Sequence, residues 1–516
     1  MPDPPPRTAH VTPPPPRSPR SPRDRDADRA DARADRAAIA AIALCVAFGV
    51  VASALAARTS PWLDEVWTFE LLPRVMHASD VLLRLPHANN HPLNTLYLYW
   101  LGDVGDRFAL YRLHSIAAGA LVVGFGAAFA WRFGRAAAVI AAALLATSFV
   151  VVHHASQARG YALMLAGALG ATTFLARDLD APRARSALAY AACTAVAFLA
   201  NLYYLHTFVA LAVWSGAVLL ERALRAEGPL SARLGRAALA VARLHALPVA
   251  VFAFVFRVFY LPGLTGTQFA TDHRGIVVQA VSLAFGGPFV GPGAERLFVF
   301  GALAFAAGLA VVARRRDRTA LLFALAIALA PALVLAVSRP RALFVRFFAA
   351  SEVYLLLLVA IALGALARAR RAGRLGAVVA TAVALAIAAA NLSHVVDLVR
   401  YGRGQYDDAF RYMAAETVGP VTVASDHVLA MRLMSQFWAR LLPEASIVFL
   451  PEPDAASPPR FFVRVARPWP AEIQYAGHLY DRDRLFRTSG FGFDWQLYRL
   501  VPMADALRRK GIDPGR

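Results

Sequence analysis

Long runs of apolar residues alternate along the chain with short polar stretches that are rich in arginine. Two of the longest apolar runs cover residues 320–337 and 375–390. A helix needs about 20 residues to cross the hydrocarbon core of a bilayer, which is about 30 Å thick. The pattern predicts a mainly α, polytopic membrane protein of about eleven spanning helices. We place them near 37–57, 109–131, 136–153, 160–176, 186–201, 203–221, 244–262, 295–313, 319–337, 346–367 and 375–393.

Composition agrees with this prediction. Hydrophobic residues make up 58% of the 516 residues and charged residues only 17%. A soluble chain of this length would need more polar surface to cover its cores. The two cysteines, Cys45 and Cys193, lie in separate apolar runs, so we expect buried thiols and no disulfide framework.

The formal net charge is +20, which could indicate a nucleic-acid partner. The location of the charge along the chain decides between nucleic-acid binding and a membrane protein with basic loops. Nearly all of it is arginine, and the arginines cluster in short stretches between apolar runs, as at 314–318. Such clustering is typical of cytoplasmic loops under the positive-inside rule. We therefore expect a multi-pass protein of the cytoplasmic (inner) membrane that contacts membrane lipids and binds no nucleic acid.

The charge also orients the chain. Residues 1–36 are rich in proline, arginine and aspartate, which predicts a disordered cytoplasmic tail. Residues 58–108 then follow the first span on the outer face, where prolines break the apolar stretches, so we expect interfacial helices there. A second outer segment, 263–294, contains glycine and proline pairs and predicts a re-entrant or surface loop.

The last part of the chain is of mixed polarity. Residues 421–424 and 447–450 have the composition of short strands, and 426–441 has the pattern of an amphipathic helix. The sequence therefore predicts a transmembrane domain over 37–393, followed by a small extracytoplasmic α/β domain over 394–516.

Four polar clusters fall on the predicted outer face. They surround Asp64 with Glu65, His91, Arg159 and Arg346. Ionisable groups at the bilayer boundary are costly and indicate function by default. Acids and arginines together suit sugar transfer from a lipid phosphate. A carboxylate can accept the proton of the acceptor hydroxyl, and cations can hold the departing phosphate while an oxocarbenium-like centre forms.

The order of these motifs resembles that of the GT-C membrane glycosyltransferases. The closest groups are the protein O-mannosyltransferases and the bacterial lipid A aminoarabinose transferases, which are glycosyltransferase family 39-like. The resemblance extends from about residue 40 to about residue 360. Its motifs are Trp-Leu-Asp-Glu at 62–65, Asn-His-Pro-Leu at 90–93, Tyr-Arg-Leu-His-Ser at 111–115, Gln-Ala-Arg-Gly-Tyr at 157–161 and Arg-Phe-Phe at 346–348.

The resemblance implies GT-C architecture, a polyprenyl-phosphate-linked sugar donor and an inverting reaction. By the same resemblance, Asp64 is the catalytic base and Glu65 helps to orient the acceptor or a metal. The implied donor- or phosphate-binding residues are His91, Arg159, Tyr161 and Arg346. No cofactor is certain. A divalent metal cation is a further candidate for holding the phosphate, with Asp64, Glu65 and His91 as its candidate ligands.

Two departures leave the acceptor open. Leu93 stands where the mannosyltransferases carry a second proline, and 263–294 is too short for the β-rich domain that they insert. These departures argue against a folded protein as the acceptor and favour a lipid, a glycan or a polyol. A protein stays open as the remaining alternative.

Two alternative readings stay open beside the enzyme. One is a lipid-linked glycan flippase or transporter, although few ionisable residues lie deep in the spans and no internal repeat is evident. The other is a structural membrane subunit with an outer C-terminal domain, which leaves the clusters at Asp64, Glu65 and Arg346 without a purpose. For Arg112 we expect a structural role, in which it pairs with Asp103 or Asp106 to hold the loop.

Overall fold

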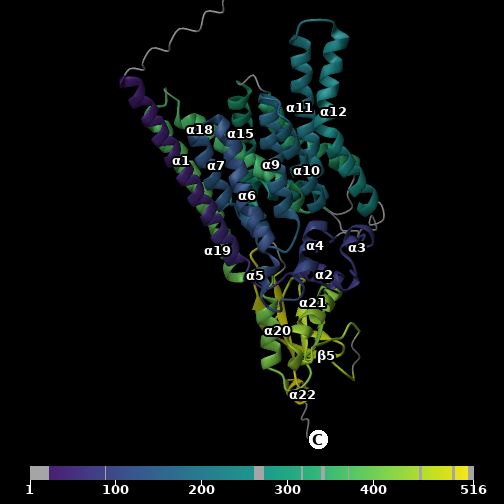
Figure 1. Cartoon of the computed structure of the whole chain (residues 1–516). Coiled ribbons are helices and arrows are strands. Elements are labelled where there is room, and N and C mark those ends of the chain that lie inside the picture. Colours follow the sequence, from purple (N-terminus) through teal and green to yellow (C-terminus); the bar gives the residue numbers. More distant parts are fainter. Residues whose placement is uncertain are drawn as a thin grey trace, which may run out of the picture.

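The computed structural model describes residues 22–87, 89–260, 272–314, 318–338, 343–369, 371–452, 456–490 and 494–509. It has two parts, a bundle of long helices and a smaller domain of helices and strands at one end of the bundle (Figure 1). The expectation of a helical membrane domain with a small α/β domain is confirmed.

Within the described residues, nine helices are long and apolar enough to cross a membrane. Two further predicted spans are less regular. One is the pair α7 and α8, which is bent by 57°, and the other is α10, which is 17 residues long. Each predicted span thus falls on helix. The bounds are α1 (Pro22–Ala56), α6 (Leu113–Ala130), α7 (Arg135–Thr147), α8 (Phe149–Ala155), α9 (Tyr161–Asp180), α10 (Ala184–Ala200), α11 (Leu205–Arg225), α12 (Leu230–Val255), α15 (Pro292–Ala313), α16 (Thr319–Ala324), α17 (Ala330–Ser338), α18 (Ala349–Ala367) and α19 (Gly373–Tyr401).

The bundle is layered around two buried helices. Helices α9 and α18 are mostly enclosed, whereas α1, α15 and α19 expose large apolar side chains such as Leu44, Leu303 and Leu385. Exposed apolar faces of this kind suit contact with lipid. Small residues let the inner helices approach closely: a Cβ on Gly167 of α9 would lie 2.7 Å from the Cys193 carbonyl oxygen of α10.

The N-terminal prediction needs a correction. Residues 22–36 are not disordered but form the first turns of α1, while residues 1–21 lie outside the described part. The segment is rich in arginine and aspartate and also contains alanine; arginine and alanine are both strong helix formers. Asp31 and Asp35 lie one turn apart, and both pair with Arg135 at the start of α7. A local propensity and a tertiary ion pair together extend the helix beyond its apolar part.

Residues 58–108 fold as predicted into short helices that do not span. They are α2 (Leu63–Leu71), η1 (Leu72–Arg74), α3 (Ala78–Leu83), α4 (Pro92–Leu101) and α5 (Phe108–Tyr111). Helices α2, α3 and α4 lie between the bundle and the C-terminal domain (Figure 1). Val75, Val81 and Leu85 are buried in a small core of their own beside α4.

The segment 263–294, predicted as a re-entrant or surface loop, contains a helix. Residues 263–271 lie outside the described part, but α14 (His273–Ala284) is a helix of 12 residues. The predicted helix break follows it. Gly286 adopts φ +73 and passes so close to Asn391 and Ala390 that a side chain there would clash with their backbone.

The C-terminal domain holds one sheet of six strands in the order β2-β1-β3-β6-β5-β4. Strand β1 is parallel to β2 and β3, and the remaining pairs are antiparallel. Both predicted strands and the predicted helix are present, but α19 continues to Tyr401, so the domain begins after 401 and not at 394. Its elements are α20 (Tyr406–Ala415), β1 (Thr422–Ser425), α21 (Val428–Leu441), η7 (Pro443–Ala445), β2 (Val448–Phe449), β3 (Phe461–Arg464), β4 (Glu472–Tyr475), β5 (His478–Phe486), β6 (Trp495–Leu500) and α22 (Met503–Arg509).

Helix α21 packs the C-terminal domain against the short helices of residues 58–108. The ring of Phe437 stacks on Phe69 of α2 with centroids 5.6 Å apart, and Trp438 meets Phe108 at 6.0 Å. Arg440 adds an ion pair with Glu70. The C-terminal domain therefore packs directly against α2, the helix that begins at Leu63.

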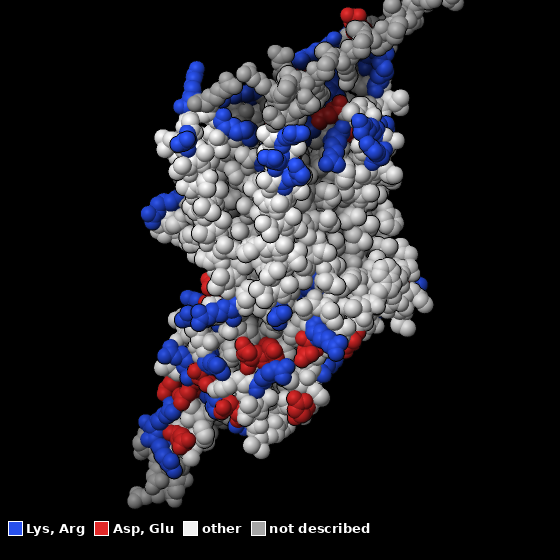
Figure 2. Space-filling model, turned by 60° about the vertical axis from the view of Figure 1, so that its left-hand side comes forward, with Lys and Arg blue, Asp and Glu red and all other residues white. Residues whose placement is uncertain are grey.

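Charge divides the visible surface into three zones (Figure 2). A broad band with few charged side chains separates an end where arginines gather from an end where arginines and acids mingle. The mixed end carries the C-terminal domain. Such a band is what a protein surrounded by lipid requires.

Candidate active site

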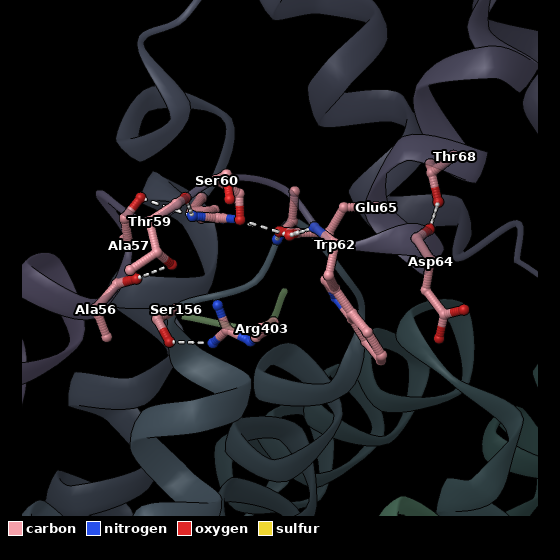
Figure 3. Close-up of polar contacts among 12 residues, drawn as sticks. Ala56, Ala57, Thr59, Ser60, Trp62, Asp64, Glu65, Thr68, Ser156 and Arg403 are labelled. Atoms are coloured by element: carbon pink, nitrogen blue, oxygen red, sulfur yellow. Dashed lines mark hydrogen bonds and ion pairs between the residues drawn. The ribbon is translucent and has the colours of Figure 1, made fainter. Parts of the chain in front are cut away.

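The start of α2 sends its two adjacent carboxylates in different directions. Trp62 is the N-cap residue, and its backbone N–H donates to Oε2 of Glu65 at 3.2 Å, which is half of a capping box. Figure 3 shows the carboxylates of Asp64 and Glu65 pointing away from each other. Two neighbouring acids therefore enter two different environments.

Asp64 faces two arginines that come from distant parts of the chain. It forms ion pairs with Arg159, which precedes α9, and with Arg346, whose Nη1 lies 3.3 Å from Oδ2. Burial by itself would raise the pKa of Asp64, but the charges of Arg159 and Arg346 outweigh it and hold the pKa below its ordinary value. In this state Asp64 is an ionised carboxylate with little affinity for a proton.

His91 positions Arg159 from the other side. Its Nε2 lies 3.0 Å from Nη2 of Arg159, which must donate, so Nδ1 carries the proton and donates to the Ala200 carbonyl at 3.1 Å. Burial first, and the Arg159 charge second, lower the pKa of His91 to about 3. Gly160 allows this approach, because a Cβ there would clash with the same Ala200 oxygen. His91 is thus a neutral support for an arginine.

The lowered pKa of His91 predicts a pH dependence of stability. In the unfolded chain the His91 imidazole becomes protonated below about pH 6.5, whereas in the folded chain it stays neutral down to a pH of about 3. Between these values the free energy of unfolding therefore falls by up to about 1.4 kcal/mol for each pH unit by which the pH is lowered. The thermal midpoint of the wild type should therefore fall more steeply between about pH 7.5 and about pH 5 than that of His91→Gln. Parallel pH profiles for the two proteins would contradict the assignment of a neutral, buried His91.

Aromatic rings enclose the two arginines. The guanidinium carbon of Arg159 lies 5.7 Å from the ring centroid of Trp62 and 5.3 Å from that of Tyr161, and Arg346 lies 6.0 Å from Trp62. Cations over aromatic faces at these distances are attracted and held in place. The structure therefore brings Asp64, His91, Arg159, Tyr161 and Arg346 into one cluster at the mixed-charge end of the bundle.

Glu65 is enclosed completely and every contact is internal. Arg112 donates to Oε1 from Nε at 2.8 Å and to Oε2 from Nη2 at 2.6 Å, and the Ala158 N–H donates to Oε1 at 2.6 Å. Burial would raise the pKa of Glu65, but the Arg112 charge holds it below its ordinary value. This carboxylate ties α2 to α6 and to the segment before Arg159.

The expected partner of Arg112 is corrected by these contacts. Arg112 pairs with Glu65, while Asp103 accepts from the Tyr111 hydroxyl at 2.9 Å and from the Gly105 N–H at 2.8 Å. The reason is that Arg112 lies at the junction of α5 and α6 and points inward. There it also donates to the carbonyls of three residues after α1, namely Ala57, Thr59 and Ser60.

Sequence reasoning missed a fourth arginine, Arg403, which follows α19. Its side chain is only 1% exposed, and Nη2 donates to the Ser156 hydroxyl at 2.6 Å and to the His153 carbonyl at 2.9 Å (Figure 3). Its flanking glycines, directly after the last span on the predicted outer face, were the available signal. Its contact partners, His153 and Ser156, are 250 and 247 positions away in the sequence, so no local pattern indicates these contacts.

Charge does not balance within this group of residues. Arg112, Arg159, Arg346 and Arg403 surround two carboxylates, Asp64 and Glu65, which leaves an excess of two positive charges. All four arginines have at most 22% of the side chain exposed. Buried excess charge is costly unless a counter-ion joins it. The arrangement is therefore suited to an anion.

The donor set fits a metal ion poorly. Within the described ranges, no three His, Cys, Asp or Glu side chains form a group that could hold a metal. Arg159 contacts both Asp64 and His91, so its guanidinium occupies the place where a cation shared by those two candidates would lie. Glu65 faces Arg112 instead.

Comparison with known proteins yields fold neighbours alone. No protein-family model matches the sequence, and no curated protein does. Two similar solved structures are those of ArnT from Cupriavidus metallidurans, both 16% identical to this chain. The match with the apo structure covers 83% of this chain and 93% of the ArnT chain, with a TM-score of 0.49. The match with the structure bound to undecaprenyl phosphate covers 90% of this chain and 98% of the ArnT chain, with a TM-score of 0.47.

Proposed function

We propose that the protein is an integral membrane glycosyltransferase. It moves a hexose or pentose from a polyprenyl-phosphate donor to a hydroxyl acceptor. The observation that carries this proposal is the excess of two guanidinium groups over carboxylates in the group formed by Asp64, Glu65 and the four buried arginines. A sugar phosphodiester carries one negative charge, and the phosphate gains a second as its bond to the sugar breaks. A site with excess positive charge stabilises that developing charge more than it stabilises the bound donor.

Asp64 is the proposed base. As the acceptor oxygen attacks the anomeric carbon, the acceptor proton passes to the Asp64 carboxylate and the bond from that carbon to the phosphate oxygen breaks. The sugar carbon has oxocarbenium character in between. Attack from the face opposite the leaving phosphate inverts the configuration.

The paired state of Asp64 supports coupling between donor binding and base strength. In the free protein, Arg159 and Arg346 lower the pKa of Asp64. A phosphate that draws these guanidinium groups to itself removes that influence, so the pKa of Asp64 rises and the carboxylate becomes a stronger base. The base would then become effective only when the donor is present.

The remaining predicted residues take supporting roles in this proposal. Arg159 and Arg346 hold the phosphate, as guanidinium forks suit that anion. Neutral His91 and the ring of Tyr161 keep Arg159 in place. Glu65 is a positioning residue, because its contacts with Arg112 and Ala158 are internal to the protein.

We place the site on the outer face of the cytoplasmic membrane. The arginine-rich end of the molecule suits the cytoplasmic side, and the mixed end with the C-terminal domain suits the opposite side (Figure 2). The N-terminus is then cytoplasmic. The acceptor can be a lipid, a glycan or a protein.

Reconstitution tests the proposed function. Purified protein in proteoliposomes is supplied with labelled polyprenyl-phosphate sugars and a mixture of envelope lipids, glycans and peptides as acceptors. Label should move to an acceptor, and free polyprenyl phosphate should accumulate with protein but not in empty vesicles. A wild-type protein that moves the intact donor between leaflets without cleaving it would instead establish a flippase.

A further inference from the structure

The segment that carries Arg403 is held by the C-terminal domain. The Trp495 indole of β6 donates to the Gly404 carbonyl at 2.8 Å, and the Ser489 N–H donates to the Gly402 carbonyl at 3.0 Å. Gly402 adopts φ +61, and a Cβ there would lie 3.0 Å from Thr59, directly after α1. The backbone on both sides of Arg403 is thus fixed by contacts from two parts of the protein.

The guanidinium of Arg403 is buried and only partly used. One nitrogen, Nη2, donates to Ser156 and His153. Nε and Nη1 are buried and have no hydrogen-bond partner among the residues that the structure describes. The neighbouring carboxylate, Glu65, is engaged by Arg112 through both oxygens. A buried cation in this situation is costly without an anionic partner.

Other unpartnered polar atoms lie in the same surroundings. Over the described part of the chain, Trp62 Nε1 and both ring nitrogens of His154 are buried without a hydrogen-bond partner. His153 connects them: its ring lies 6.4 Å from that of Trp62 and 5.2 Å from that of His154, and its carbonyl accepts from Arg403. Buried polar groups normally have partners, so unused donors of this kind mark a place for a ligand.

The Trp62 indole stands at the boundary between Arg403 and the Asp64 cluster. Arg159 and Arg346 both lie over the Trp62 ring. Arg403 is drawn between Ser156 and that indole (Figure 3). Ser156, which accepts from Arg403, lies three positions before Arg159 in the same segment, so both arginines are attached to or contact one short stretch of the chain.

We propose that Arg403 is a phosphate-binding residue through which the C-terminal domain completes the site. The proposal rests on the glycosyltransferase function and names the phosphate of the polyprenyl carrier as the anion. Nε and Nη1 donate to its oxygens, and the Arg403 charge adds to those of Arg159 and Arg346. The C-terminal domain then has a defined role, because β6 keeps the backbone at 402–404 in place.

Binding to the full-length protein in nanodiscs tests this inference without catalysis. The probes are a polyprenyl phosphate and the uncharged polyprenol of the same chain length. Arg403→Gln should weaken phosphate binding about ten- to hundredfold and leave polyprenol binding unchanged, because a hydrogen bond to a charged group is lost. Arg400→Gln is the matched control: Arg400 is exposed, three residues earlier, and its loss should change neither affinity.

Several outcomes would overturn the assignment. Wild-type affinity of Arg403→Gln for the polyprenyl phosphate is one of them. A normal carrier affinity with a raised KM for the acceptor is another, since Arg403 would then serve the acceptor. If Arg403→Gln does not fold, Arg403→Lys takes its place in the binding test. A ratio of phosphate affinity to polyprenol affinity equal to that of the wild type would then contradict the proposal. A wild type that does not prefer the phosphate refutes the proposed function itself, separately from Arg403.

Discussion

Asp64→Asn is expected to lower the rate of sugar transfer by about 10²- to 10⁴-fold while polyprenyl phosphate binds at least as tightly as to the wild type. Asparagine has nearly the shape of aspartate but cannot accept the acceptor proton. The substitution also removes the charged partner of Arg159 and Arg346, so the two guanidinium groups can interact with the carrier phosphate without competition from a carboxylate. Loss of kcat with retained or improved affinity separates a base from a binding residue.

Turnover and carrier affinity are measured on the same preparation for this test. Glu70→Gln is the control, because Glu70 lies on α2 as well but pairs with Arg440 at the surface. Its transfer rate should equal that of the wild type. Unchanged turnover in Asp64→Asn would remove Asp64 as the base, and much weaker carrier binding would make it a ligand of the donor.

Glu65→Gln is expected to destabilise the fold by about 3–5 kcal/mol, the cost of leaving a buried partner charge uncompensated. Arg112 would remain enclosed, with 1% of its side chain exposed, and without its carboxylate. The same Glu70→Gln control removes an exposed ion pair and should cost at most about 1 kcal/mol. Thermal unfolding in one detergent should therefore give a clearly lower midpoint for Glu65→Gln than for Glu70→Gln.

The double variant Glu65→Met with Arg112→Met sharpens this test. Removing both charges abolishes the unpaired cation, so the double variant should be more stable than Arg112→Met or Glu65→Met alone. Strict additivity of the two single effects would show that the pair is not coupled. A Glu65→Gln protein with the wild-type midpoint but no turnover would return Glu65 to the catalytic step.

Apolar runs made the membrane domain predictable because lipid demands continuous apolar helices. The same runs could not indicate that α7 and α8 form a bent pair, which depends on packing and not on hydropathy. The helix over residues 22–36 was missed for a related reason. Its sequence is polar, and its partner Arg135 lies 100 positions after Asp35.

The site was predictable as far as each motif follows or precedes a span on one face. Asp64, Arg159 and Arg346 meet because topology brings those span ends together. The sequence predicted different roles for Asp64 and Glu65, but it did not predict that Glu65 pairs with Arg112 inside the protein. A glutamate at the third position of a helix is a common capping residue, and this was the available signal. Arg403 carries no local pattern, and only the fold shows that it reaches Ser156.

A structure of the full-length protein with a bound polyprenyl phosphate tests the central claim most directly. We expect the phosphate within hydrogen-bond distance of guanidinium groups of Arg159 and Arg346, with Arg403 completing its contacts and Asp64 beside the position of the sugar carbon. A phosphate bound at the arginine-rich opposite end, or at the mixed end but away from Asp64, would contradict it.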